Sequence, residues 1–596
     1  MDRLDEDGWY REAYRRDVAQ LTLRAVATGA VLGFVLSFAN VYIGLKTGWF
    51  FSMALAAALA SFATWQVLAA AGFARTPLTI LETNCMQSTA SSAAYATGNM
   101  VVGIVPAMLL LSGTQPSWGA LAAWIACVGA LGVTLAIPLK RQLINRERLK
   151  FPSGTAAAIM LHGLFRRGGE LRVRGRLLAG AIGLGALLAV VRDLRGLAVI
   201  ASSSRVFDWL PRLHASGGVY SASQLGIVLD HSVLLVAAGV FVGLRTSAWM
   251  VVGGLITAFA IGPAAVEAGA GTRLDFAWAE SGVWAGAPFL VAYAAVALGG
   301  QWRAIARALR GRRRDAISKD AAEIEIPAAW FWTGFALCGT AAVVLARVLF
   351  GIPIIFGVLA VAMSLVFSTV ACRITGETDI TPGGPIGKLT QVAFGALRPH
   401  HPTTNLVTAS LTHASSVAAA DLLNDLKSGY LLGADPRKQF VAQALGIVAG
   451  TCASVLAYHV LVPDVNALTD GRFAAPAAHQ FRAIAELLQD GIASLHPLHQ
   501  ALVIGGAAAG LVFAALERLA PPHVRRFVPS AAGLGLGLLV PVSTSIGMFV
   551  GASLAALVAR IRGGDTGKRV WPIAAGALAG ESLAGVVVAV VNNVTG

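Results

Sequence analysis

Long stretches without a charged residue recur along this chain of 596 residues. Residues 25–45, 49–73 and 118–138 are examples, and each is long enough for the roughly 20-residue helix that crosses a bilayer. Only 13% of the residues are charged, whereas soluble globular chains carry about 25%. In lipid every backbone polar group needs a partner within the chain, so such segments form helices. The sequence therefore predicts an all-α polytopic membrane protein.

Basic residues, which give a net charge of +15, cluster in short loops between the apolar stretches. Loops of this kind stay on the cytoplasmic side of the inner membrane. The N-terminus is therefore expected in the cytoplasm, because it carries Arg11, Arg15, Arg16 and Arg24. The same distribution favours a lipid bilayer, and not a nucleic acid, as the partner of the positive charge.

Following these loops predicts roughly 14–16 spanning helices. Segments 151–165 and 528–559 are apolar with basic residues at both ends, so each is expected to form a re-entrant hairpin. One hairpin in each half predicts an internal two-fold repeat. The expected divisions are a cytoplasmic N-terminal segment 1–24, a first membrane repeat 25–302, a basic cytoplasmic linker 303–326, and a second membrane repeat 327–596 with an external loop 462–497. Further expectations are one span over 219–243, an arginine-rich loop over 166–176 and a polar cytoplasmic segment over 421–439.

Two polar tracts interrupt the apolar sequence, at residues 82–92 and 404–416. A polar group without a partner in hydrocarbon costs several kcal/mol, so such tracts lie within protein or line a wet cavity. Paired tracts in two halves are typical of a transporter's binding site, although small residues alone also serve close helix packing. The predicted substrate-binding residues are Glu82, Asn84, Gln87, Ser91, Asn405, Thr408 and His413.

Ionisable residues at membrane depth are candidates for proton coupling, because they are costly there. The sequence singles out Glu82, Glu377, Asp379 and Glu581. Glu82 could equally mark the start of a helix, and Glu377 and Asp379 could belong to a solvated turn. His413 could relay protons or be a hydrogen-bonded core histidine.

A third set of residues is predicted to gate the transport pathway or to pack helices. Asp425 and Lys427, together with Asp421, lie in the polar segment expected at the cytoplasmic surface. Pro152 and Gly154 open the first predicted hairpin and are typical of a broken helix.

Several motifs in order along the chain resemble those of the oligopeptide transporter (OPT) family. The most specific is Asp-Leu-Lys-Ser-Gly-Tyr-Leu-Leu-Gly-Ala-Asp-Pro-Arg-Lys-Gln at 425–439, which is similar to the family's cytoplasmic signature. Shorter similarities are the first-helix motif at 40–49, Glu-Thr-Asn-Cys-Met-Gln at 82–87, Phe-Pro-Ser-Gly-Thr-Ala at 151–156 and the terminal helix at 572–581. The Asn-Pro-Gly and Lys-Ile-Pro-Pro-Arg motifs of the fungal and plant peptide branch are missing, which indicates the prokaryotic branch.

The resemblance implies a secondary, typically proton-coupled importer of small peptides, with the proton gradient as its energy source and no cofactor. It also implies a possible homodimer. The related yellow stripe-like branch implies the alternative of a metal–chelate transporter for siderophore-like or nicotianamine-like ligands. A channel or a lipid-handling membrane protein is a more distant alternative. The chain lacks GxSxG, HExxH and P-loop motifs, so neither an enzyme, a bound metal nor ATP-driven transport is predicted.

Overall fold

The computed structural model describes residues 8–48, 50, 54–73, 76–166, 168–194, 201–209, 212–215, 218–299, 323–378, 381–469, 473–521, 528–562 and 567–594. Helices dominate these residues, and the four strands among them are two or three residues long. The fold is therefore helical, as the uncharged stretches predict.

Eleven helical segments of the described chain are long and apolar enough to cross a membrane. They are α2 (Leu23–Thr47); α4 (Ile80–Ser91), α5 (Asn99–Val102) and α6 (Ile104–Ser112), which together form one segment; α7 (Trp118–Lys140) with a π-helical continuation to Arg146; α11 (Leu244–Ile256) with α12 (Gly262–Glu267); α16 (Ala328–Phe350); α17 (Ile354–Thr378); α19 (Pro402–Leu432); α20 (Pro436–Leu461); α23 (Pro497–Leu519); α25 (Val542–Arg562); and α26 (Gly567–Val594). This agrees with a polytopic membrane protein. The total of roughly 14–16 spans, the re-entrant hairpins and the two-fold repeat stay predictions.

Shorter or less apolar elements complete the described fold. They are α3 (Ala54–Ala70), α8 (Pro152–Arg166), α9 (Gly168–Asp193), α10 (Val233–Val242), α13 (Val283–Gly299), α18 (Gly383–Leu397), α21 (Asn466–Thr469), α22 (Pro476–Asp490) and α24 (Ala531–Gly537). Strand β1 (Ser203–Ser204) pairs with β4 (Leu229–Asp230), and β2 (Leu213–Ala215) pairs with β3 (Gly218–Tyr220), both antiparallel.

Two expectations about these elements are wrong. Residues 219–243 do not form one span, because β3, β4 and a short turn occupy this region until α10 begins at Val233. A serine and a glycine hold the backbone in turns there: Ser223 donates to the Asp208 carboxylate through its backbone N–H and its hydroxyl, and Gly226 has a φ of 72°. The arginine-rich segment 166–176 is no loop, because α9 already begins at Gly168. Arginine is a good helix former, which permits this extension.

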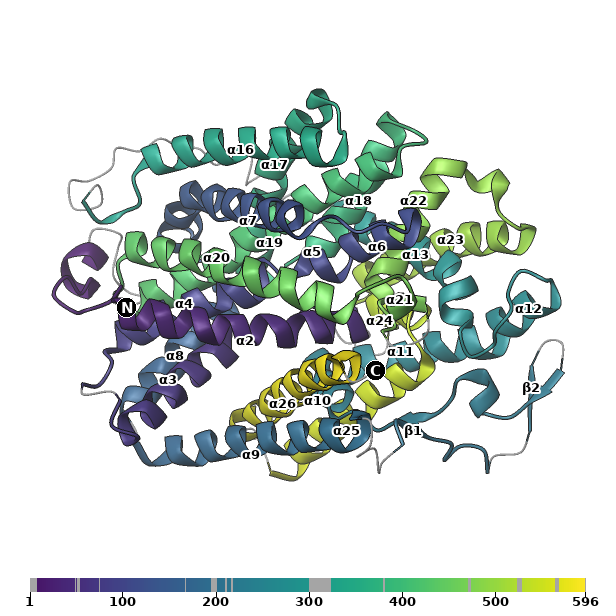
Figure 1. Ribbon diagram of the computed structural model, residues 1–596, viewed down its shortest axis with the longest axis horizontal. Helices are drawn as coiled ribbons and strands as arrows, with labels where there is room; N and C mark the ends of the chain where they lie inside the picture. The colour runs from purple at the N-terminus through teal and green to yellow at the C-terminus, as the bar shows by residue number, and fades with distance from the viewer. Residues whose placement is uncertain are drawn as a thin grey trace.

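The helices pack into two groups (Figure 1). The central group, in the upper and left part of the view, contains α2, α3, α4, α7, α8 and α16 to α20. The lateral group contains α9, α10, α11, α13 and α23 to α26, and α2 and α13 link it to the central group. Each group therefore combines helices that precede the basic linker 303–326 with helices that follow it.

Helix α19 lies in the middle of the central group and packs against α4, α7, α8, α17, α18 and α20. Within its most apolar 18-residue window, 94% of the residues are buried. The polar residues from Asp421 onward continue this helix to Leu432. The expectation of a surface segment beginning at Asp421 is therefore corrected, because helices packed around α19 cover these side chains.

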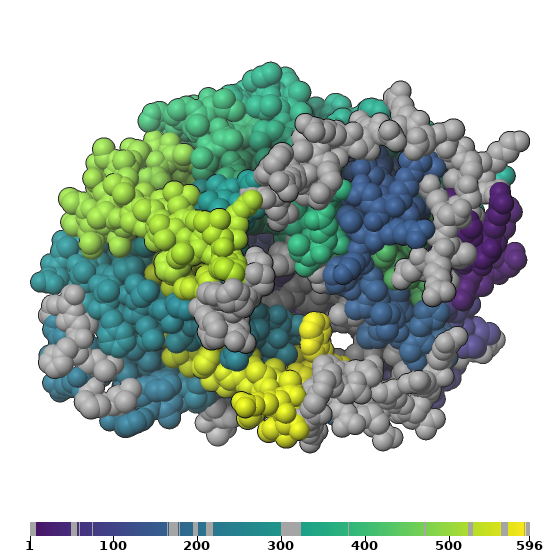
Figure 2. All heavy atoms as spheres, turned by 180° about the vertical axis from the view of Figure 1, so that it is seen from behind, coloured from purple at the N-terminus to yellow at the C-terminus, as the bar shows by residue number. Residues whose placement is uncertain are grey.

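The opposite face of the molecule is hollowed near its middle (Figure 2). Its rim carries green atoms of the α17–α19 region, blue atoms of the α7–α8 region and yellow atoms of the C-terminal helices. The hollow therefore lies where the central and lateral groups meet.

Candidate functional site

The ends of α19 are fixed by its sequence. Pro402 occupies the start of the helix, where its fixed φ is favourable and its missing N–H costs nothing. Gly433 ends the helix in the left-handed conformation with a φ of 80°. Between them the helix runs for 31 residues without an interruption. Because residues four apart lie on one face of a helix, Asp421 and Asp425 are neighbours on the same side of α19.

These two aspartates form a buried acid pair, and each side chain is 1% exposed. The Asp421 carboxylate accepts hydrogen bonds from Ser91 Oγ at 3.2 Å and from Gln443 Nε2 at 3.1 Å. Asp425 Oδ1 accepts one from Gln87 Nε2 at 2.6 Å, and its Oδ2 has no partner among the described residues. The acid pair therefore lies where α4, α19 and α20 meet.

No cation of the described chain forms an ion pair with either aspartate. A buried carboxylate without a positive partner is destabilising by several kcal/mol unless it takes up a proton or meets a cation. Two such groups one helical turn apart also repel each other when both are ionised. The acid pair is therefore suited to binding a proton or a cationic group.

The close approach of α20 to α4 depends on glycine. A Cβ atom at Gly446 would lie 2.3 Å from the carbonyl oxygen of Thr89, so no larger residue fits there. This contact brings Gln443, three residues earlier on α20, to Asp421. One turn before it, Gln439 donates to the backbone carbonyl of Asp425 at 2.9 Å. Amide side chains therefore surround the acid pair from the α20 side.

Three predicted residues of the first polar tract gather around this pair. Gln87 and Ser91 bond to the aspartates directly, as described above. Asn84 Oδ1 accepts a hydrogen bond from Ser428 Oγ at 2.8 Å, and its Nδ2 has no partner among the described residues. The structure thus joins part of this tract to α19.

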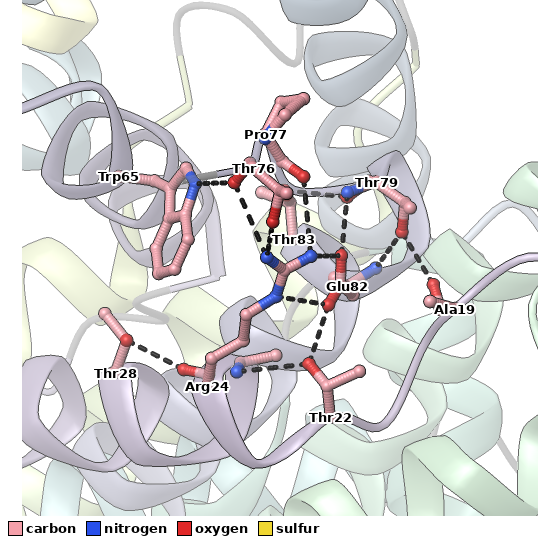
Figure 3. Close-up of polar contacts among 11 residues, drawn as sticks. Ala19, Thr22, Arg24, Thr28, Trp65, Thr76, Pro77, Thr79, Glu82 and Thr83 are labelled. Atoms are coloured by element: carbon pink, nitrogen blue, oxygen red, sulfur yellow. Dashed lines mark hydrogen bonds and ion pairs between the residues drawn. The ribbon is translucent and has the colours of Figure 1, made fainter. Parts of the chain in front are cut away.

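Glu82 belongs to the same tract but lies in a separate contact at the start of α4 (Figure 3). It forms a capping box with Thr79, whose backbone N–H it accepts at 2.9 Å. Arg24 donates to its two oxygens at 2.8 and 2.7 Å, and Thr22 donates at 2.7 Å. All of the Glu82 oxygens are therefore occupied, which suits the alternative of a residue that marks a helix start.

Glu581, on α26, is likewise buried and fully bonded. Its Oε1 accepts from Arg192 at 2.9 Å and from Ser232 at 2.7 Å. Its Oε2 accepts from the backbone N–H of Leu234 at 2.7 Å. This contact joins α9, α10 and α26 within the lateral group.

The remaining predicted proton carriers lie around the end of α17. Glu377 is 33% exposed and pairs with Arg373, one turn earlier, at 3.6 Å. Asp379 lies outside the described residues. The structure does not bring Glu377 to the acid pair, and the coupling roles of both residues stay predictions.

The predicted residues of the second polar tract lie on α19 but make separate contacts. Asn405 Oδ1 accepts from Gln391 of α18 at 3.3 Å, and Thr408 donates to the carbonyl of Thr404 in its own helix at 2.8 Å. His413 lies beside α18, and its Nδ1 has no partner among the described residues. Only the later part of α19, which follows this tract, reaches α4 at the acid pair.

The residues predicted to gate or pack lie along the same helix. A Cβ atom at Gly154 would lie 2.1 Å from the carbonyl oxygen of Asn424, so α8 packs directly against α19. Pro152, the first residue of α8, is exposed. Lys427 is 5% exposed, and its Nζ lies 5.9 Å from the ring centre of Tyr430. Gly154 thus has a packing role, and the gating roles stay predictions.

The N-terminal segment covers the end of α19. The Trp9 ring stacks on Tyr430 with centroids 4.5 Å apart, and Trp9 Nε1 donates to the Tyr430 carbonyl at 2.9 Å. Tyr10 donates to Glu325 at 2.7 Å, and Glu325 forms an ion pair with Lys140 of α7. The segment therefore ties α19 to α7 and to the residue stretch before α16.

Sequence reasoning did not identify Gln443 or Lys388, and it predicted a cytoplasmic gating or packing role for Asp421. A usable signal was present for the acid pair, because Asp-x-x-x-Asp places two carboxylates on one helix face. Gln439 and Gln443 repeat that spacing on the next helix. The sequence around Lys388 of α18 did not single it out, because what distinguishes this lysine is that it has no partner among the described residues.

Comparison with known proteins agrees with this architecture. A family model described as OPT oligopeptide transporter protein matches residues 20–592. A Saccharomyces cerevisiae protein named as an oligopeptide transporter is 24% identical, with 89% of this chain and 90% of that protein covered. The iron-phytosiderophore transporter yellow stripe 1 of Zea mays is also 24% identical, with 95% of this chain and 89% of the relative covered. A metal-nicotianamine transporter of Oryza sativa subsp. japonica is 22% identical over 95% of this chain and 91% of its own length.

The family match covers nearly the whole chain, including every helix of the central group. It also agrees with the motifs at 425–439 and 82–87 and with the eleven apolar helical segments. The chain is therefore a multi-pass membrane protein, not an enzyme, and it belongs to the OPT family of oligopeptide transporters.

Proposed function

We propose that this chain is a secondary active, proton-coupled importer of small peptides or peptide-like solutes across the cytoplasmic membrane. The observation that carries the proposal is the acid pair, Asp421 and Asp425, which is buried in the central group and forms no ion pair with a described cation. In a membrane protein a buried ionisable group of this kind is a candidate for ion or proton coupling.

The acid pair has the chemistry that a proton-coupled step needs. When Asp421 and Asp425 are ionised, burial and mutual repulsion destabilise the packed state around α19. Uptake of a proton from the outer side removes part of this cost. A conformation that closes around the pair is then favoured, and release of the proton on the inner side favours the reopened one. Coupling thus follows from the different free energy of the two protonation states in each conformation.

The positions of Glu82 and Glu581 support assigning the coupling to the aspartates. Each glutamate accepts from an arginine and from other donors, so protonation would break bonds that the charged form makes. The acid pair accepts hydrogen bonds from neutral groups alone, and one oxygen has no partner among the described residues. We therefore propose Asp421 and Asp425 as the coupling groups, ahead of Glu82, Glu377, Asp379 and Glu581.

Uptake into proteoliposomes tests this function. The purified chain is given labelled di- to tetrapeptides with and without an inward proton gradient. We expect saturable accumulation that depends on the gradient. Asp425→Asn should lower gradient-driven accumulation at least tenfold while leaving the exchange of labelled for unlabelled solute. Glu377→Gln, at a partly exposed helix end, is the matched control and should retain accumulation.

Two results would contradict the proposal. If Asp421→Asn and Asp425→Asn both concentrate the solute normally while Glu82→Gln or Glu581→Gln does not, the coupling group is one of the glutamates. If flux through the wild type is neither saturable nor dependent on the gradient, the channel or lipid-handling alternative gains support.

A metal–chelate importer is the second candidate, favoured by the plant relatives named for iron-phytosiderophore and metal-nicotianamine transport. Both candidates share the proton-coupled mechanism and differ only in the solute. The same vesicles, supplied with labelled iron in complex with a chelator, separate the two. Uptake that requires the metal favours the chelate, whereas uptake of metal-free peptides favours the peptide.

A further inference from the structure

Lys388 of α18 is a buried cation. Its side chain is only 8% exposed. Among the described residues it makes no hydrogen bond and no ion pair, unlike Lys140, which meets Glu325. An ammonium group that is largely covered by protein and has no partner is destabilising, and lysine is seldom buried unless it is paired. An anionic group from outside the described chain would therefore stabilise the lysine at this position.

His413 of α19 lies beside this lysine. A Cβ atom at Gly383 would lie 3.2 Å from His413 Cε1, and one at Gly387 would lie 3.2 Å from His413 Cβ. Because both positions are glycine, the imidazole can lie directly against α18. Gly387 is the residue immediately before Lys388. No hydrogen bond of standard geometry joins His413 Nδ1 to another described residue, and a Cβ atom at Gly383 would lie 3.3 Å from it.

Gln391 borders the same place, three residues beyond Lys388 on α18. Its Nε2 donates to the Phe481 carbonyl at 2.7 Å, which fixes the side chain, and its Oε1 has no partner among the described residues. Lys388, His413 and Gln391 thus present an unpaired charge and two unpaired polar atoms. Such atoms in a protein interior call for a ligand or for water.

Other charged places in the described chain give weaker support for a ligand site, because their charges are paired. The groove beside α12 and α22 contains Arg482 and Glu486, which pair with each other at 2.7 Å. The buried Arg192 of the lateral group is neutralised by Glu581 and Asp193. Lys388 differs from both because its charge has no counterpart among the described side chains.

We propose that Lys388, with His413 beside it, binds a carboxylate of the transported solute. This assignment rests on the proposed function and narrows its substrate class to solutes with a free carboxylate. The lysine ammonium has three donors and forms a charge-assisted hydrogen bond to a carboxylate. His413 Nδ1 donates a second bond in the tautomer that carries its proton there. A peptide C-terminus and a carboxylate chelator both supply this group.

Binding to the purified protein in detergent tests the site without a proton gradient. The probes are trialanine and its C-terminal amide, and the ferric complexes of a carboxylate chelator and of an uncharged hydroxamate chelator. We expect the wild type to bind one carboxylate probe at least tenfold more tightly than its counterpart without a carboxylate. The pair that shows the preference identifies the source of the carboxylate.

Lys388→Met should abolish this preference, because it removes the charge and keeps an unbranched side chain that is only one atom shorter. Lys388→Arg should retain it, and Lys438→Met, the same change on α20, should leave it unaltered. If Lys388→Met does not fold, His413→Phe replaces it, because it keeps a ring beside Lys388 and removes both nitrogens. A reduced preference in that variant supports the site.

The proposal is wrong if the folded Lys388→Met or the folded His413→Phe protein retains the full preference. It is also wrong if the wild type binds neither carboxylate probe more tightly than its counterpart without a carboxylate, whether or not gradient-driven uptake occurs. A clear preference without gradient-driven uptake would instead support the carboxylate site and contradict the proposed coupling. The two hypotheses therefore fail separately.

Discussion

Two buried acidic centres of this protein differ in how their charge is balanced. In the lateral group, Glu581 accepts hydrogen bonds from Arg192, from Ser232 and from a backbone N–H. In the central group, Asp425 accepts one from Gln87 and has no cation among the described residues. The first centre fixes three helices in one arrangement. The second centre contains a carboxylate that is destabilising when ionised, because no described cation compensates it, so equal burial of two carboxylates does not imply an equal role.

The largest effect is expected from Arg192→Met. It leaves Glu581 buried without a cation, which costs about 3–5 kcal/mol. We expect a markedly lower thermal unfolding temperature in detergent. The double variant with Glu581→Gln should recover much of the loss, because the uncompensated charge is then gone. If Arg192→Met unfolds at a temperature close to that of the wild type, the Glu581 centre does not depend on its arginine and does not differ from the acid pair in this respect.

A smaller loss of stability is expected for Glu82→Gln. It weakens charge-assisted bonds to Arg24 and the capping box of α4, together worth about 1–3 kcal/mol. Arg24 is 35% exposed, and solvent screening reduces its share. Thermal unfolding against Thr83→Ser, a neighbouring change that keeps the hydroxyl, measures the effect. A loss as large as that of Arg192→Met would show that exposure of the arginine does not matter here.

A pH-dependent effect is expected at the N-terminal segment. Burial alone would raise the pKa of Glu325, but Lys140 and the hydrogen bonds from Tyr10 and Asn145 outweigh it and hold that pKa below its ordinary value. A lowered carboxyl pKa stabilises the folded contact above about pH 4.3, and this contribution is lost as the pH falls further. We expect the Trp9 contact to loosen under acid.

Tryptophan fluorescence monitors this change, with Trp9→Phe as the control that isolates the signal of Trp9. The difference between the two proteins should stay constant from neutral pH down to about pH 4.3 and change below it. A change centred near neutral pH would assign the transition to another group. The Glu325 carboxylate would then not be an example of a paired buried acid that differs from both Glu581 and Asp425.

The smallest effect on stability is expected for Asp425→Asn. No described cation loses a partner and the bond from Gln87 can be kept, so Asp425→Asn should cause no loss of stability, because it removes a buried charge that has no described cation. Thermal unfolding of this variant completes the comparison. A loss similar to that of Arg192→Met would mean that Asp425 is structural and would weaken its assignment as a coupling group.

The sequence predicts the helical membrane class well, because long stretches without charge indicate segments that lie in lipid and not in water. It also offered the start of a helix as one of two readings of Glu82. It failed at 219–243, where hydropathy does not register the serine and glycine turns. It failed again at Asp421, because a polar segment looks solvated until the neighbouring helices are known. Lys388 shows a general limit, since the absence of a partner is a property of packing.

The uninterrupted length of α19 sets a physical connection between the two polar places along it. His413 and Asp421 are eight residues apart, which corresponds to about 12 Å along the helix axis. At an effective dielectric constant of about 20, unit charges at that separation interact by roughly 1.4 kcal/mol, or about tenfold in an equilibrium constant. Under the proposed roles, a charge gained at either place alters the binding affinity at the other place, by the same factor in both directions. The rigid helix acts as a spacer, and its rise per residue sets the strength of this linkage without any atom having to move.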